Sequence, residues 1–322
     1  MDKPEGMSLR AVGGLIAVAL LLTLASACGG DDDGASTTPS STADAAGTTA
    51  PAGDRETASS APTDAPTVTP TPIPGPAPGE DPPGDQLLYL ALGDSLSEGI
   101  GASDEKRTAW VPLVAIGLGD EYELLNLGVA GDDSEELIED GPLDTALTEI
   151  ANRANDGVPG NEVAVITLEI GGNDLLDLYF DLVIPGTCPS VDEALQRPEC
   201  VEALEDALAD YQPNLQYTID QLQAAAPGVP IYLMTLYNPF SGGGGNLDRI
   251  GVLALEGEPG TPFPDGLNDV IREFGSEPDV HIVEWYELFI GRQNDYIYQD
   301  LIHPNDTGHR VMADAVLAAM GR

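Results

Sequence analysis

Five short apolar runs, separated by segments with helical spacing, constrain the fold of this chain more than any other feature. The runs lie at Leu87–Leu92, Tyr122–Asn126, Val163–Ile170, Pro230–Leu236 and Val280–Trp285. The helical segments lie at Trp110–Leu118, Leu143–Ala154, Val191–Ala226, Gly266–Phe274 and Thr307–Met320, with breaks expected at Pro198 and Pro213. This alternation predicts parallel strands joined by right-handed crossover helices. We therefore expect one α/β domain, a doubly wound three-layer α/β/α sandwich around a five-stranded parallel sheet, with its site beyond the carboxyl ends of the strands.

The first quarter of the 322-residue chain does not share this pattern. Residues 29–85 are nearly all Gly, Asp, Ser, Thr, Ala and Pro. A segment with so few large apolar side chains cannot offset the entropy that it would lose on ordering. We therefore predict a disordered linker over residues 29–85 and a single folded domain over residues 86–322.

Residues 1–28 have the features of an export signal. An apolar run over Ala11–Ala27 follows two basic residues and is short for a permanent membrane span. The run ends in Ala25-Ser26-Ala27-Cys28, which resembles the bacterial lipoprotein signal, in which the cysteine becomes the lipidated first residue. We expect an exported protein anchored through Cys28 to the extracytoplasmic face of the cell membrane. The alternative is an ordinary signal peptide cleaved nearby, with Cys28 incidental.

Two further cysteines, Cys188 and Cys200, lie within the predicted domain. In an exported chain such a pair favours a disulfide, which would contribute on the order of 3 kcal/mol in the chain-entropy model. A zinc site is disfavoured because no histidine lies near them. Two free thiols are the alternative.

The charge balance is strongly acidic. Twelve Lys and Arg residues against 55 Asp and Glu residues give a formal net charge of −43. Such a surface repels phosphate backbones and anionic lipid headgroups, which argues against nucleic-acid binding and against docking on acidic membranes.

The first apolar run ends in Gly93-Asp94-Ser95, where the chain must turn. A continuous apolar run is typical of a strand buried on both faces, and ligand sites in open α/β sheets lie just past such strands. Ser95 is therefore a candidate nucleophile. Taken alone, Gly-Asp-Ser is equally compatible with an ordinary turn.

A serine nucleophile needs a base, and the chain has three histidines. His281 begins a predicted strand, where a structural role is favoured, and His309 lies in the first turns of the last helix and more readily supports a loop. His303 precedes Pro304, which disfavours helix, and Asp300 is near enough in sequence to orient its Nδ1 hydrogen. A local Asp-His bond that only stabilises this loop is the alternative.

An acyl-transfer site also needs hydrogen-bond donors for the developing oxyanion. Three donors can be assigned: the Ser95 N–H, the Gly131 N–H at a position where a Cβ would crowd a substrate, and the neutral amide of Asn173. Taken separately, Gly131 could be a turn glycine and Asn173 a helix cap.

Four segments of the chain together resemble the sequence blocks of the GDSL, or SGNH, family of serine hydrolases. They are Gly93–Gly99, Asn126–Asp132, Ile170–Asp174 and Asp300–Asn305. The resemblance implies a flavodoxin-like sheet and cleavage of carboxylic esters, of lipase, arylesterase or lysophospholipase type, through an acyl-enzyme. It assigns Ser95, Asp300 and His303 to catalysis and Ser95, Gly131 and Asn173 to the oxyanion hole. It implies a small-molecule or lipid ester as substrate, and no metal or organic cofactor.

Two other functions remain open from the sequence. A cell-surface carbohydrate O-acetylesterase would use the same residues on acetylated polysaccharide. A surface binding protein would have kept the fold and lost the chemistry. The glycine run at residues 241–245 is either a mobile flap or a plain surface loop, and Trp110 and Trp285 favour core packing over lining a pocket.

Overall fold

The computed structural model describes residues 86–322. The predicted signal with Cys28, and the predicted linker over residues 29–85, lie outside the described residues. Within residues 86–322, no helix is both long enough and apolar enough to cross a membrane.

Five parallel strands form the sheet, in the order β2-β1-β3-β4-β5. Their bounds are β1 Leu87–Gly93, β2 Tyr122–Gly128, β3 Val163–Glu169, β4 Ile231–Met234 and β5 Val280–Val283. This strand order is that of the flavodoxin-like doubly wound folds, in which the chain turns to opposite sides of the first strand. The predicted five-stranded parallel α/β fold is confirmed.

The register of the three neighbouring strands brings their carboxyl ends together. Gly93 at the end of β1 pairs with Gly128 at the end of β2 and with Glu169 at the end of β3. Because β1 lies between β2 and β3, this point is the topological switch of the sheet, where ligand crevices form. The segments that follow β1, β2 and β3 carry Ser95, Gly131 and Asn173.

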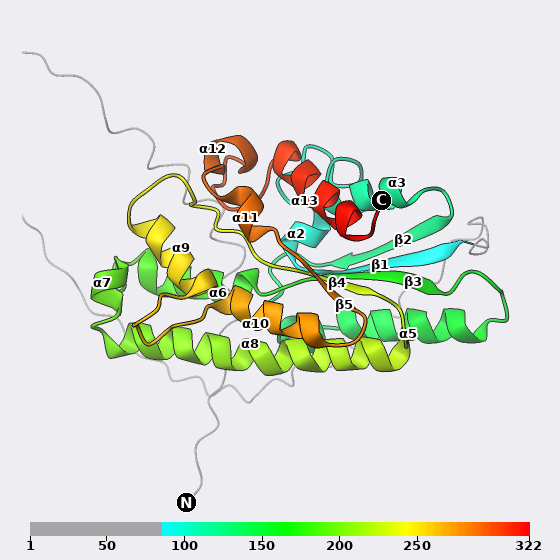
Figure 1. The fold of residues 1–322 in the computed structure, drawn as a ribbon, viewed down its shortest axis with the longest axis horizontal. Coiled ribbons are helices and arrows are strands. Elements are labelled where there is room, and N and C mark those ends of the chain that lie inside the picture. The colour runs from blue at the N-terminus through cyan, green and yellow to red at the C-terminus, as the bar shows by residue number, and fades with distance from the viewer. Residues whose placement is uncertain (1–85) are drawn as a thin grey trace, which may run out of the picture. The chain divides into compact units, whose positions relative to one another are not determined.

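Helices cover both faces of the sheet (Figure 1). One face packs against α5 (Pro142–Asn155), α8 (Pro198–Ala225) and α10 (Leu267–Glu273), with Leu88 and Leu90 of β1 in the same core. The opposite face packs against other helices, α3 (Trp110–Leu118) and α13 (Asp306–Ala319), and buries Tyr89 and Ala91 of the same strand. Alternate residues of β1 thus enter two different cores, which explains its continuous apolar sequence.

The two tryptophans pack in the core rather than around a pocket. Trp110 and Trp285 are both fully buried, and their rings meet edge to face with centroids 5.1 Å apart. The favoured interpretation from the sequence was core packing, and the structure agrees with it.

The segment expected to be helical over Val191–Ala226 has one of its two expected breaks. It contains α7 (Val191–Ala194) and then α8, which begins at Pro198, so the first break is present. The expected break at Pro213 is wrong, because α8 runs through it. A proline inside a helix costs about 3 kcal/mol. Burial of Tyr211 and Leu215 on the sheet side, at about 1.5–3 kcal/mol each, keeps the helix continuous while Pro213 faces solvent.

Several short elements were not expected from the sequence. They are α2 (Ser95–Glu98), α4 (Glu136–Glu139), α6 (Gly172–Leu178), the π-helical turn η2 (Tyr179–Val183), α9 (Asn246–Glu256), the 3₁₀ turn η3 (Phe274–Ser276), α11 (Tyr286–Phe289) and α12 (Gln293–Tyr296). Four of them, α2, α6, η2 and α9, contribute residues to the cavity at the candidate site.

Candidate active site

Ser95 is held at a sharp turn between β1 and α2. Gly93 must be glycine here, because a Cβ at this position would overlap the carbonyl oxygen of Glu169 and the hydroxyl of Ser97. The next residue, Asp94, caps α2, since its Oδ1 accepts a hydrogen bond from the Leu96 N–H at 2.9 Å. Ser95 is therefore fixed as the first residue of α2 at the carboxyl edge of the sheet.

His303 and Asp300 complete a chain of hydrogen bonds to Ser95. The His303 Nε2 lies 2.9 Å from the Ser95 Oγ, and the His303 Nδ1 lies 2.7 Å from the Asp300 Oδ2. These distances fall within the reach required of a nucleophile, its general base and the group that orients the base. The structure thus brings Asp300 and His303 beside Ser95, although Ser95 and His303 are 208 positions apart in the sequence.

The charge on Asp300 sets the tautomer of His303. Burial raises the pKa of Asp300, but hydrogen bonds from the His303 ring and from the Ile302 and His303 N–H groups outweigh it, so the pKa is lowered overall. Asp300 is therefore an anion and favours a proton on the His303 Nδ1. The Nε2 lone pair is then directed at the Ser95 hydroxyl, as a general base requires.

The loop that carries His303 is tied down on both sides. The His303 carbonyl oxygen accepts a hydrogen bond from the Tyr298 N–H at 2.7 Å, and the Ile302 carbonyl accepts one from the Tyr237 hydroxyl at 2.8 Å. Asn305 then caps α13 through the N–H groups of Thr307 and Gly308. The imidazole position is consequently set by the scaffold rather than by a free loop.

The three candidate oxyanion donors follow β1, β2 and β3. Within residues 86–322, neither the Ser95 N–H nor the Gly131 N–H donates a hydrogen bond to another residue. Asn173 donates one amide hydrogen to the Asp132 carbonyl at 2.8 Å, which fixes the side chain and leaves its second hydrogen available. Gly131 has φ of +99°, so its conformation is itself a reason for glycine.

The helix-cap alternative for Asn173 does not fit the structure. The residue that caps α6 is Gly171, and no side chain makes a capping hydrogen bond there. The Asn173 amide instead reaches across to the loop after β2. Ser95, Asn173 and His303 line one cavity, whereas Gly131 is not among the residues that line it.

The other two histidines take structural positions. His309 is fully buried, accepts the Trp110 N–H at its Nδ1 and contacts the Ile100 carbonyl through its Nε2, at 3.3 and 3.1 Å. Burial lowers the pKa of His309 to about 4. His281 is exposed on the edge strand β5, where its ring stacks on Tyr232. Neither residue lines the cavity at Ser95.

The cavity at Ser95, here called the substrate cavity, has a volume of about 120 Å³ and is mostly apolar. Its walls include Leu175 and Tyr179, Tyr237 and Phe240 after β4, and Ile250 on α9. These residues were not expected at the site from the sequence. The position after the fourth strand was a usable signal for Tyr237 and Phe240, because all parallel strands end at one edge.

The glycine run lies at the start of α9. Ser241 is anchored by two contacts, since its hydroxyl accepts the Gly291 N–H at 2.9 Å and its carbonyl accepts the Gln293 N–H at 3.3 Å. A Cβ on Gly242 would lie 2.7 Å from the Gly291 Cα. These contacts favour the surface-loop interpretation over the flap for the first part of the run.

Residues 91–311 match the GDSL-like lipase/acylhydrolase family. The chain belongs to this family. The resemblance described from four short segments is therefore confirmed, and the protein is a hydrolase of carboxylic esters.

Individual relatives of this GDSL-like hydrolase are distant. The spore germination lipase LipC of Bacillus licheniformis is 22% identical over 242 residues, covering 72% of this chain and 96% of that protein. The uncharacterized protein YpmR of Bacillus subtilis is 23% identical over 243 residues, covering 73% and 82%. The crystal structure of the lipase Lip_vut3 from a goat rumen metagenome has a TM-score of 0.54 at 21% identity, covers 73% of this chain and 97% of that one, and supports the fold.

A buried pair of carboxyl groups lies directly under the nucleophile of this GDSL-like hydrolase. Glu169, at the end of β3, is fully buried and hydrogen bonds to Asp94, and its Oε2 accepts the Ser97 hydroxyl at 3.3 Å. Burial raises the pKa of Asp94 to about 6, and burial together with the neighbouring Asp94 raises the pKa of Glu169 well above its usual value. The raised pKa favours the neutral acid form of Glu169, which can donate a hydrogen bond to Asp94.

Glu169 was not expected at the site from the sequence, because it lies within the apolar run at Val163–Ile170. Its effect on stability has a definite sign. The folded protein keeps a proton on Glu169 that the unfolded chain releases above the ordinary pKa of glutamate. The contribution of Glu169 to the free energy of unfolding is therefore fully present at low pH and is lost as the pH rises toward the raised pKa of the folded protein.

The variant Glu169→Gln keeps a hydrogen-bond donor and cannot ionise, so it lacks this loss. We expect its melting temperature, relative to the parent, to rise as the pH increases above the ordinary pKa of a glutamate, about 4.3. Glu202→Gln, at an exposed position of α8, controls for the removal of one negative charge. Melting curves would refute a neutral Glu169 if both variants showed the same pH dependence relative to the parent.

Proposed function

We propose that the chain is an exported serine esterase that cleaves carboxylic esters through an acyl-enzyme on Ser95. The observation that carries the proposal is the chain of two hydrogen bonds, 2.9 Å from the Ser95 Oγ to the His303 Nε2 and 2.7 Å from the His303 Nδ1 to Asp300. Ser95 and His303 line an apolar cavity, which suits the acyl part of an ester.

In the first half of the reaction, the Ser95 Oγ attacks the ester carbonyl carbon while the His303 Nε2 takes the hydroxyl proton. Asp300 stabilises the imidazolium that forms. The carbonyl oxygen becomes an oxyanion, which the Ser95 N–H, the Gly131 N–H and the Asn173 amide stabilise. Collapse of the tetrahedral intermediate breaks the bond to the alcohol, which leaves with the proton from His303.

In the second half, a water molecule attacks the acyl carbon of the ester formed on Ser95. His303 takes a proton from this water and returns it to the Ser95 Oγ as that oxygen leaves. The products are the free carboxylic acid and the original enzyme. Every proton transfer in this cycle is assigned to His303, and no metal or organic cofactor takes part.

The proposal is tested with p-nitrophenyl esters of increasing acyl length, beside an acetylated sugar. We expect turnover of the p-nitrophenyl esters. Turnover of the acetylated sugar alone would support the carbohydrate O-acetylesterase instead. No turnover of any ester by folded protein would leave the surface binding protein as the better account.

Attachment to the membrane through Cys28 is a separate part of the proposal. It rests on the small residues Ala25-Ser26-Ala27 directly before a single cysteine. We expect full-length protein expressed in a bacterium that lipidates exported proteins to fractionate with membranes, and Cys28→Ser to be released or misprocessed. Equal retention of the variant and the parent in the membrane fraction would contradict the lipid anchor.

A further inference from the structure

A second apolar cavity adjoins the substrate cavity. It has a volume of about 90 Å³, and the two cavities share the wall residues Leu175, Tyr179, Ile250 and Ala254. Leu175 belongs to α6, Tyr179 to η2, and Ile250 and Ala254 to α9. The two cavities are therefore neighbours, and residues of α6, η2 and α9 lie between Ser95 and the second cavity.

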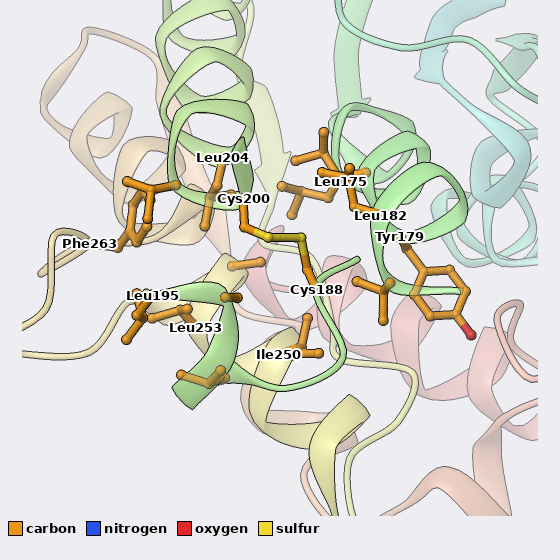
Figure 2. A pocket seen from close by; sticks show the side chains of 16 residues that line it. Leu175, Tyr179, Leu182, Cys188, Leu195, Cys200, Leu204, Ile250, Leu253 and Phe263 are labelled. Carbon is orange, nitrogen blue, oxygen red and sulfur yellow. A yellow bond between two sulfur atoms is a disulfide. The ribbon is translucent and has the colours of Figure 1, made fainter. Parts of the chain in front are cut away.

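The walls of the second cavity are almost entirely apolar. Leu195 on α7, Leu204 on α8, Leu253 on α9 and Phe263 line it, and the only polar side-chain atom of its lining residues is the Tyr179 hydroxyl. Figure 2 shows the disulfide between Tyr179 and Leu182 on one side and Leu195 and Phe263 on the other. A lining of this kind favours an apolar ligand over a polar one.

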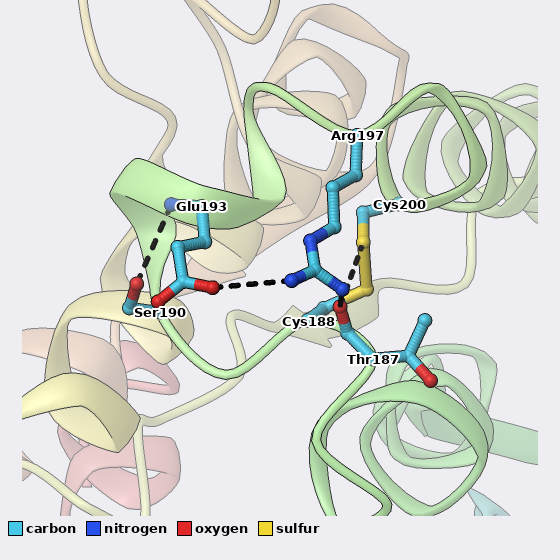
Figure 3. The surroundings of a disulfide bond; sticks show 6 residues. All are labelled: Thr187, Cys188, Ser190, Glu193, Arg197 and Cys200. Atoms are coloured by element: carbon cyan, nitrogen blue, oxygen red, sulfur yellow. Dashed lines mark hydrogen bonds and ion pairs between the residues drawn. A yellow bond between two sulfur atoms is a disulfide. The ribbon is translucent and has the colours of Figure 1, made fainter.

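The disulfide fixes one wall of this cavity. It joins Cys188, in the segment after η2, to Cys200 in the first turn of α8. Figure 3 shows Arg197 bracing the same segment, with its Nη1 donating to the Thr187 carbonyl at 2.6 Å and its Nη2 pairing with Glu193 at 3.2 Å. The wall is thus held by a covalent bond and by an ion pair, although it consists of short elements.

We propose that the second cavity, here called the acyl chamber, receives the distal methylene groups of a long acyl chain whose ester carbonyl lies at Ser95. The inference rests on the proposed function and names its substrate class, esters of long-chain fatty acids. A sugar or a charged headgroup would leave its polar groups without hydrogen-bond partners in this chamber. Each methylene group that enters is worth about fourfold in kcat/KM, because its burial contributes about 0.8 kcal/mol.

The test compares p-nitrophenyl dodecanoate with p-nitrophenyl acetate, both kept below the concentration at which they form micelles. The dodecanoyl chain extends well beyond Ser95, whereas the acetyl group stays beside it. The quantity measured is the ratio of kcat/KM for the two esters. We expect this ratio to exceed about 10 in the parent, since only a few buried methylene groups are needed.

Two variants move the ratio in opposite directions. Ala194→Phe places a large side chain in the acyl chamber from α7, and we expect it to lower the ratio at least about tenfold. Leu204→Ala widens the chamber from α8, and we expect the ratio for still longer chains, such as the hexadecanoate, to rise. Ala209→Phe is the matched control, because Ala209 is exposed on α8 and lines neither cavity. Its ratio should equal that of the parent.

The outcomes separate the two proposals. If the parent hydrolyses neither ester, the proposed function fails, and the acyl chamber with it. If the parent hydrolyses acetate but the ratio is the same in the parent, Ala194→Phe and Ala209→Phe, only the acyl chamber is overturned. A variant that is merely unstable loses activity on both esters and leaves their ratio unchanged, and melting curves identify it.

Discussion

Alanine at Ser95 is expected to lower kcat for a p-nitrophenyl ester by a factor on the order of 10⁶. The reason is that the Ser95 Oγ is the only group positioned 2.9 Å from the proposed base, His303 Nε2, in the described part of the chain. The next serine along the chain, Ser97, is fully buried, and its hydroxyl shares its hydrogen between the Leu92 carbonyl and Glu169. The measurement is steady-state turnover of parent and variant at saturating ester.

Alanine at His303 should cost nearly as much, and the double variant should be little worse than either single one. Nucleophile and base act as a unit, so removing the second gains nothing once the first is gone. Ser97→Ala is the matched control for a lost hydroxyl on the same short helix. Losses that multiply in the double variant would contradict the unit, and substantial turnover by Ser95→Ala would place the nucleophile elsewhere.

Asn173→Ala is expected to lower kcat by a factor on the order of 10² to 10³ while KM changes little. An oxyanion donor bonds more strongly to the developing negative charge than to the ground-state carbonyl, so its loss appears in kcat rather than in substrate binding. Loss of the hydrogen bond to the Asp132 carbonyl should cost only about 1 kcal/mol of stability.

Kinetics and a melting curve on the same Asn173 variant distinguish a catalytic amide from a structural one. Asn173→Asp is the informative companion, because it keeps the shape of the side chain and removes the donor. Both variants should be folded and slow. A variant that is less stable but fully active would remove Asn173 from the oxyanion hole.

The sheet could be predicted from the sequence because a buried parallel strand has a local signature. All five apolar runs became strands, with ends that differ by a few residues, for example Pro230–Leu236 against the observed Ile231–Met234. The end of each run also located the candidate site, since Ser95, Gly131 and Asn173 all follow strands that finish at one edge.

The cavity walls could not be predicted in the same way. The helix α9 follows the glycine run that suggested a flap or a surface loop, and it lines the substrate cavity together with η2 and α6, which are distant in sequence. Pro213 misled for a related reason, because a local rule against proline was outweighed by packing on the far side of α8. The place of Glu169 in the site could not be predicted, because its partner, Asp94, is far away in the sequence.

The disulfide could be predicted from the sequence only in part. Cys188 and Cys200 could be paired from the sequence because they are the only cysteines in the predicted domain. Their place in the wall of the acyl chamber depends on how η2, α7, α8 and α9 pack, and the pattern of one segment carries no information on that.

The central claim, that Ser95 is an activated nucleophile, is tested most directly by labelling the folded protein with a fluorophosphonate and mapping the modified peptide by mass spectrometry. The reagent reacts with an activated serine and not with an ordinary surface hydroxyl. We expect one phosphonylated residue, Ser95, and no labelling of Ser95→Ala or of denatured protein. An unlabelled parent, or a label on another serine, would contradict the claim.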